Sequence, residues 1–156
     1  MQRLLGISMV SMLMFATPAS GIACESTPEL ALKQFIAAFN ALDWPAFRAC
    51  FAESASLFNP DVPGATSLHR LDGREAVERS FRGVFDAAAA GSTPPHGPNI
   101  VPEHLKIQQY GAAAVLSFEF RRAAGSFGRR TIVMAKQADG WHIVHIHASN
   151  VTHADP

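Results

Sequence analysis

The second half of the chain alternates between apolar and polar residues with a period of two, which is the pattern of β-strands. Short turn signals interrupt the alternation at Gly111, at Ala124-Gly125 and at Asp139-Gly140. Strands joined by such short turns form an antiparallel meander. The pattern predicts four strands, over residues 103–110, 112–122, 127–137 and 141–150.

The first half of the chain repeats its apolar residues at the spacing of a helix instead. Leu32, Phe35, Ile36 and Phe39 fall at i, i+3, i+4 and i+7 and predict one helix with an apolar stripe. Thr27 can cap this helix, Asp43 a short second one, and Asp72 a third that runs into the alanines at 87–90. Helices that precede strands are typical of an α+β domain with the helices on one face of the sheet.

The two faces of the meander differ in polarity. One parity class is almost entirely apolar, and burying each large side chain contributes roughly 1.5–3 kcal/mol, so we expect this class to face the helices. It comprises Leu116, Phe118, Phe120, Ile132, Met134, Val144, Ile146 and Ala148.

The opposite class mixes apolar, charged and imidazole side chains. It is too apolar for solvent and too polar for a core, which is typical of a homodimer interface. A β-bulge would exchange the two classes along part of a strand. We expect the dimer contact to include Glu119, Trp141, His145 and His147.

The composition indicates an ordinary globular domain. The chain has 156 residues, with 13 basic and 13 acidic side chains, so it lacks the charge excess of proteins that bind nucleic acid. Residues 1–23 have the pattern of a signal peptide, with Arg3, an apolar run too short for a membrane span, and small residues before Cys24. We therefore expect a periplasmic or secreted domain over residues 24–156, and a retained membrane anchor is the alternative.

Export would place Cys24 and Cys50 where disulfides persist. A bridge between them would tie the new N-terminus to the end of the second helix and contribute about 3 kcal/mol. The alternative is a lipoprotein, because Gly21-Ile22-Ala23 before Cys24 is close to a lipobox.

No metal or cofactor site is predicted. His145 and His147 stand on one face of a strand, roughly 7 Å apart, and Glu119 is close in the expected sheet. No third ligand follows from the spacing, so two interface imidazoles are the simpler interpretation. Protonation below their reference pKa near 6.5 would then weaken the dimer.

Four motifs, together with the order of the elements, resemble the nuclear-transport-factor-2-like superfamily. They are Ala41-Leu42-Asp43-Trp44, residues 51–55, Leu71-Asp72-Gly73-Arg74-Glu75-Ala76, and Trp-x-Ile-x-His-x-His-x-Ser at 141–149. The last is similar to the end of SnoaL-like domains and of the association domain of calcium/calmodulin-dependent kinase. The resemblance implies a cone-shaped curved antiparallel sheet, three N-terminal-half helices on its concave face with a pocket between, and dimerisation through the convex face.

The catalytic residues of the superfamily's ketosteroid isomerases do not carry over. The base of its ketosteroid isomerases falls on Asn59, their oxyanion-stabilising hydroxyl near Phe35, and their protonated acid near Ile132. Isomerase chemistry of that kind is therefore not expected. The arginines of the kinase association domain fall near Glu119, Ile132 and Ala148, which argues against an acidic ligand too.

The leading interpretation is an exported, homodimeric domain that binds a small, largely apolar molecule without a cofactor. One alternative is a cyclase or isomerase that uses Asp61 as its base. Asp61 lies between two prolines, however, and aspartate is common in turns for purely structural reasons. Another is a structural assembly module whose pocket is filled by phenylalanines. The expected pocket residues are Phe35, Asn59, Phe118, Phe120, Ile132, Met134, His142, Ile146, Ala148 and Asn150.

Overall fold

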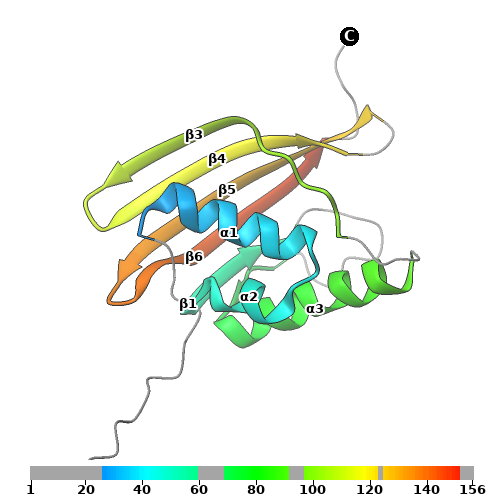
Figure 1. Cartoon of the computed structure of the whole chain (residues 1–156), viewed down its shortest axis with the longest axis horizontal. Coiled ribbons are helices and arrows are strands. Elements are labelled where there is room, and N and C mark those ends of the chain that lie inside the picture. Colours follow the sequence, from blue (N-terminus) through cyan, green and yellow to red (C-terminus); the bar gives the residue numbers. More distant parts are fainter. Residues whose placement is uncertain (1–25, 60–68, 92–96, 123–124, 152–156) are drawn as a thin grey trace, which may run out of the picture.

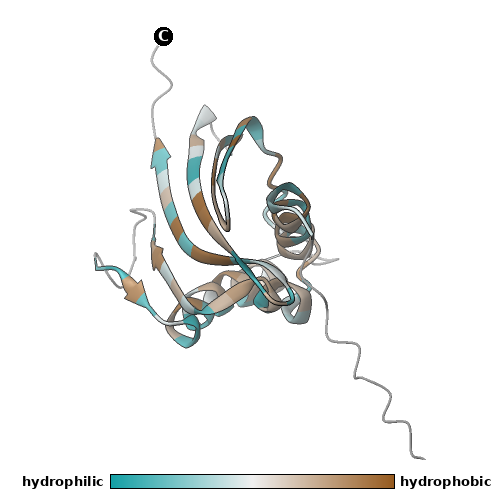
Figure 2. Ribbon diagram, turned by 90° about the vertical axis from the view of Figure 1, so that its left-hand side faces the viewer, coloured by the Kyte–Doolittle hydropathy of each residue, from teal (hydrophilic) through white to brown (hydrophobic). Residues whose placement is uncertain are grey.

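The computed structural model describes residues 26–59, 69–91, 97–122 and 125–151. Within them, six strands form one curved mixed sheet and three helices lie on its concave side (Figures 1 and 2), which confirms the predicted α+β class. The elements in chain order are α1 (Pro28–Asn40), α2 (Trp44–Ala49), β1 (Phe51–Phe58), β2 (Leu71–Asp72), α3 (Arg74–Ala90), β3 (Glu103–Tyr110), β4 (Ala113–Arg121), β5 (Phe127–Gln137) and β6 (Gly140–Val151).

Two of the three predicted helix caps are present. The Thr27 hydroxyl accepts a hydrogen bond from the Leu30 amide at 3.2 Å, and the Asp43 carboxylate accepts one from the Ala46 amide at 3.1 Å. The third prediction is wrong, because α3 is preceded by Gly73 at φ 86° with no side-chain cap. Asp72 belongs to β2 instead and accepts a hydrogen bond from Arg70.

The strand order is β2-β1-β6-β5-β4-β3. Strands β3 to β6 form the predicted antiparallel meander, but β1 lies parallel to β6, with Ser56 opposite His145 and Phe58 opposite His147. The sheet is therefore mixed rather than antiparallel throughout. Residue alternation reveals which side chains share a face of a strand, but it carries no information on the direction of a distant partner strand.

A β-bulge at Val144 changes the faces of β6. Val133 pairs with His145 and the next residue, Met134, pairs with Ile143, so Val144 has no partner in β5. The Val144 carbonyl accepts a 3.4 Å hydrogen bond from the Ser56 hydroxyl in β1. In β6, each side chain before the bulge therefore points to the face opposite to the one that simple alternation predicts.

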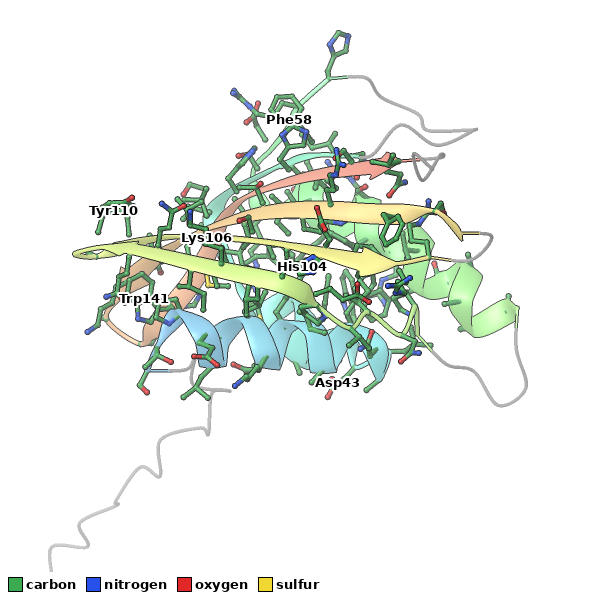
Figure 3. All side chains as sticks on the ribbon, turned by 90° about the horizontal axis from the view of Figure 1, so that it is seen from above. Asp43, Phe58, His104, Lys106, Tyr110 and Trp141 are labelled. Atoms are coloured by element: carbon green, nitrogen blue, oxygen red, sulfur yellow. The ribbon has the colours of Figure 1, made fainter. Side chains whose placement is uncertain are left out.

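The bulge corrects two expected positions. Trp141 is only 2% exposed and belongs to the core rather than to the convex face; Figure 3 shows it on the side of the sheet that α1 covers, with Phe58 on the opposite side. His142 turns away from the helices and does not line the pocket. Its Nε2 atom lies 2.8 Å from Asp139 Oδ1, and this hydrogen bond holds the pKa of Asp139 below its usual value.

Aromatic rings fill the core between the helices and β1. Phe47 is fully buried at the centre, with neighbouring ring centroids 4.9–5.9 Å away. Such edge-to-face and offset contacts add to the free energy of apolar burial. The cluster comprises Phe35, Phe39, Trp44, Phe47, Phe51, Phe81 and Phe85.

Several predictions concern residues that the structure does not describe. The signal peptide, Cys24 and the candidate base Asp61 all lie outside the described residues. Cys50 is buried, and its thiol lies 3.4 Å from the Ala46 carbonyl. In the described part of the chain, no helix is both long enough and apolar enough to cross a membrane.

Candidate functional site

A cavity of about 980 Å³ lies between the concave face of the sheet and helices α1 and α3. Its walls are mostly apolar, because both helices turn their apolar stripes toward the sheet. The helical wall consists of Phe35, Ile36 and Phe39 from α1 and of Ser80, Phe81, Gly83, Val84, Ala87 and Ala88 from α3.

Most of the expected pocket residues lie in the walls of this cavity. They are Phe35, Asn59, Phe118, Phe120, Ile132, Ile146, Ala148 and Asn150. Met134 is fully buried opposite Ala114 and Ile143 and does not reach the cavity. His142 is absent from the walls because of the bulge at Val144, as described above.

The segment before β3 closes another side of the cavity with Pro98 and Ile100. Asn40, at the end of α1, fixes this segment: its amide donates to the Ile100 carbonyl at 2.9 Å and its Oδ1 accepts from the Ile100 amide at 2.7 Å. Gly97 approaches α1 so closely that a Cβ atom there would lie 2.5 Å from the Asn40 carbonyl oxygen. The close approach therefore requires glycine at position 97.

Asn59 directly follows β1 and is the residue on which the family resemblance places the isomerase base. Its Nδ2 atom donates to the Ser80 hydroxyl of α3 at 3.0 Å. An amide cannot accept a proton at neutral pH, so this pair orients polar groups but provides no general base. The expectation from the sequence did not include Ser80, because an isolated serine on a helix has no distinguishing signal.

Two arginines form a polar end of the cavity, and the predicted pocket did not include them. Arg130 lies in β5 between Phe118 of β4 and Ala148 of β6, and Arg122 follows β4. The pKa of Arg130 is lowered to about 10 by burial and by the positive charge of Arg122. The guanidinium therefore remains charged at neutral pH.

The guanidinium of Arg130 is held by the backbone and by an aromatic ring. Its Nη1 atom donates to the carbonyls of Arg129 at 2.7 Å and Ser149 at 2.9 Å. Its carbon atom lies 4.8 Å from the centroid of the Phe120 ring, a cation–π distance. No described carboxylate forms an ion pair with it.

Gly128 makes room for the ring that supports Arg130. A Cβ atom at this position would lie 2.3 Å from two ring atoms of Phe120, the residue opposite it in β4. The Phe120 ring can therefore lie across β5 only because residue 128 has no side chain. The position of the Arg130 guanidinium therefore depends on glycine at position 128, through the Phe120 ring.

Asn150 completes the polar end. It lies opposite Gly128 in the sheet and lines the cavity. Its Oδ1 atom is buried and accepts no hydrogen bond from a described residue. Because buried polar atoms are normally paired, this amide is open to a group supplied by a bound molecule or water.

The described walls contain no carboxylate, imidazole or thiol. They therefore offer hydrogen bonds, positive charge and apolar surface, but no group with a pKa suited to proton transfer near neutral pH. Among the residues that the structure describes, no group of three or more His, Cys, Asp or Glu side chains could hold a metal ion.

The convex face carries a small cluster of Ser56, Phe58, His145 and His147. The Ser56 hydroxyl lies 2.9 Å from His145 Nδ1, and the Phe58 ring, in a residue that is 38% exposed, lies 5.7–5.8 Å from both imidazoles. The pKa of His145 is lowered by burial and by the positive charges of His147 and Arg70.

Glu119 of the expected dimer contact lies in β4, on the same convex face. Its carboxylate binds His104 Nδ1 at 3.1 Å and is 3.9 Å from Arg129 Nε. Three of the four expected contact residues are therefore on the convex side, and Trp141 is the exception.

Known structures share this fold at low sequence identity. A candidate dehydratase of the NTF2-like family from Streptomyces avermitilis matches with a TM-score of 0.65 and 18% identity, covering 80% of this chain and 94% of that one. A candidate association domain of calcium/calmodulin-dependent protein kinase type II from Thiobacillus denitrificans matches with a TM-score of 0.62 and 23% identity, covering 81% and 96%.

A candidate ketosteroid isomerase from Parabacteroides distasonis matches with a TM-score of 0.61 and 19% identity, covering 84% of this chain and 92% of that one. At these identities the likeness establishes the fold alone.

The comparison with curated protein sequences gave no significant match. The family model of the SnoaL-like domain matches residues 29–153, which include every described element from α1 to β6 except the residue that opens α1. The chain therefore belongs to the SnoaL-like domain family, within the nuclear-transport-factor-2-like fold.

Proposed function

We propose that the mature chain binds a small, largely apolar molecule in the cavity between the sheet and helices α1 and α3. The observation that carries this proposal is the cavity itself, whose volume of about 980 Å³ is at the upper end of the range for small-molecule sites. Its walls combine apolar surface with a few polar groups gathered near the ends of the strands, an arrangement that fixes the orientation of a ligand.

The open state of the cavity argues against a purely structural module. Phe35, Phe118 and Phe120 lie in its walls and do not fill it. Removing the apolar surface that lines this space from water would stabilise the fold, at roughly 25 cal/mol for each Å² buried. A module that needed only its outer surface would gain stability by closing this space.

Binding also has better support than catalysis. An enzyme of the isomerase or dehydratase kind needs a group that moves a proton, and the described walls provide none. The remaining candidate base is Asp61, which lies outside the described residues. We therefore keep an Asp61-dependent enzyme as the second candidate, which Asp61→Asn would abolish while leaving ligand binding intact.

Export and dimerisation belong to the same proposal. Residues 1–23 would direct the chain to the periplasm or outside the cell, and the convex face would pair two copies through Glu119, His145 and His147. Phe58 adds apolar surface to this face. Sedimentation at pH 8 and pH 5 tests the contact, because protonation of the two imidazoles adds like charges and weakens the dimer.

A neutral fluorescent reporter tests the cavity. N-phenyl-1-naphthylamine brightens in apolar surroundings, and we expect saturable binding to the mature protein at one site per chain. Ala88→Trp places an indole in the wall of the cavity, whereas Ala89→Trp adds the same group at the next, exposed position outside it. The first variant should lose most of the binding and the second should keep it; equal binding by both, or none by the natural chain, would refute the proposal.

A further inference from the structure

Arg130 is charged, partly buried and without an acidic partner among the described residues. Burial of an unpaired charge is costly, and proteins normally neutralise it with a counter-ion. In the described part of the chain, its hydrogen-bond acceptors are the carbonyls of Arg129 and Ser149. The described residues thus hold a positive charge at the wall of an apolar cavity and place no carboxylate against it.

The unused edge of this guanidinium has a definite shape. Both hydrogen bonds that Arg130 makes to described residues leave from Nη1, so among these residues the N–H groups of Nε and Nη2 remain for another partner. These two nitrogens form the flat side of the arginine fork, which binds the two oxygens of a carboxylate by parallel hydrogen bonds. The Phe120 ring beneath the guanidinium and Gly128 beneath that ring keep the fork in place.

A second positive charge strengthens the same end of the cavity. Arg122 lines the cavity and is close enough to Arg130 to lower its pKa. Like charges held together on a low-dielectric wall raise the local potential and attract an anion. The amide of Asn150, whose Oδ1 has no described partner, lies on the neighbouring strand and can accept a hydroxyl or, after half a turn, donate its NH₂ group.

We infer that the ligand is an amphipathic carboxylic acid, whose carboxylate binds the Nε and Nη2 edge of Arg130 near Arg122 and whose apolar body fills the rest of the cavity. The inference rests on the proposed binding function and adds the chemical class of the ligand. It also revises the expectation from family resemblance, which argued against an acidic ligand because the arginines of a related domain are not at the matching positions. The two arginines of this chain stand at other positions, in the wall of the cavity.

A matched pair of probes separates charge from shape. 2-Naphthoate and 2-naphthamide have nearly the same size, but only the first is ionised at pH 7.5. Each is titrated against the complex of the mature protein with the neutral reporter, and its affinity is read from displacement of the reporter. We expect the carboxylate to bind about tenfold to a hundredfold more tightly than the amide, as a charge-assisted bidentate pair provides.

Variants of neighbouring arginines assign the preference to one side chain. Arg130→Met keeps an unbranched, flexible side chain and removes the charge, so it should abolish the preference for the acid. Arg130→Lys keeps the charge without the fork and should retain a smaller preference. Arg129→Gln is the control, because Arg129 is exposed, points to the opposite face of β5 and does not line the cavity.

The outcomes distinguish this inference from the proposed function. Failure of the natural chain to bind either the reporter or the two probes would refute both. Reporter binding with equal affinities for acid and amide, or an unchanged preference in a folded Arg130→Met protein, would refute the carboxylate alone. Tighter binding of 2-naphthalenesulfonate or 2-naphthyl phosphate than of 2-naphthoate, by tenfold or more, would also overturn it in favour of another anion.

Discussion

The contact between Gly128 and Phe120 predicts that Gly128→Ala destabilises the domain. The new Cβ would lie 2.3 Å from two atoms of the Phe120 ring, so either the ring or the strand must move. The ring is only 6% exposed and lies between β5 and the guanidinium of Arg130, which limits its escape. Overpacking of this kind costs about 1–3 kcal/mol. At about 4 °C for each kcal/mol in a domain of this size, the Tm should fall by roughly 4–12 °C.

The same substitution at Gly83 is the control. A Cβ atom at Gly83 would meet no atom within 4 Å, and the residue lies inside α3, where alanine is favoured over glycine by roughly 0.5–1 kcal/mol. Gly83→Ala should therefore raise the Tm, whereas Gly128→Ala lowers it. Neither position has the positive φ that would strain an alanine, so the surroundings of the new methyl group decide the sign.

Thermal and urea unfolding, followed by circular dichroism at one protein concentration, measure both effects. A second change, Phe120→Leu, removes the ring atoms that the new methyl group would meet. In that background Gly128→Ala should cost less than about 0.5 kcal/mol, which gives a coupling energy of at least about 0.5 kcal/mol. A Gly128→Ala protein as stable as the natural one, or one destabilised equally with and without the Phe120 ring, would refute the reasoning.

Three further predictions concern other parts of the fold. Asn40→Ala removes both hydrogen bonds to the backbone of Ile100 and should lower the free energy of unfolding by about 1–3 kcal/mol in urea denaturation; a loss below about 0.5 kcal/mol would contradict it. The pKa of His145 is lower in the folded chain than in the unfolded chain, so just below pH 6.5 the unfolded chain binds more protons. The free energy of unfolding therefore has its full value above pH 6.5 and falls as the pH is lowered further. His145→Gln should flatten this fall in Tm between pH 7 and pH 5, and an unchanged slope would count against it. The side chain of Arg74 is 24% exposed and binds two carboxylates, so Arg74→Met should lower the free energy of unfolding by at least about 1 kcal/mol. The side chain of Arg79 is 66% exposed and binds one carboxylate, so Arg79→Met should change it by no more than about 0.5 kcal/mol. Equal losses would show that the network around Arg74 adds nothing to stability.

Local signals in the sequence predicted most of the elements. Thr27 and Asp43 act on amides three residues away, so their capping role is visible in the sequence. The strands of the meander agree with the predicted ranges to within one or two residues, because turn residues separate them. These features depend on neighbours along the chain and need no knowledge of the tertiary structure.

Contacts between distant segments were harder to predict. The bulge at Val144 depends on β1, whose Ser56 hydroxyl binds the Val144 carbonyl, and no signal within β6 indicates it. Simple alternation therefore placed Trp141 and His142 on the wrong faces. The parallel pairing of β1 with β6 was missed for the same reason.

The arginines at the polar end could have been found from the sequence. Arg130 has the parity of Ile132, and Arg122 has the parity of Phe118 and Phe120, so each continues the apolar class of its strand. A charged side chain in an otherwise apolar class is the informative exception. Its significance becomes clear when the structure shows that no described carboxylate pairs with Arg130.

The aromatic cluster around Phe47 and the polar wall at Arg122, Arg130 and Asn150 consist of different residues. Under the proposed function, thermodynamic stability and selectivity for the head group of a ligand thus depend on different residues of one small scaffold. A designer, or natural selection, can exchange the side chains at these three wall positions to accept another head group while the ring cluster continues to hold the domain together.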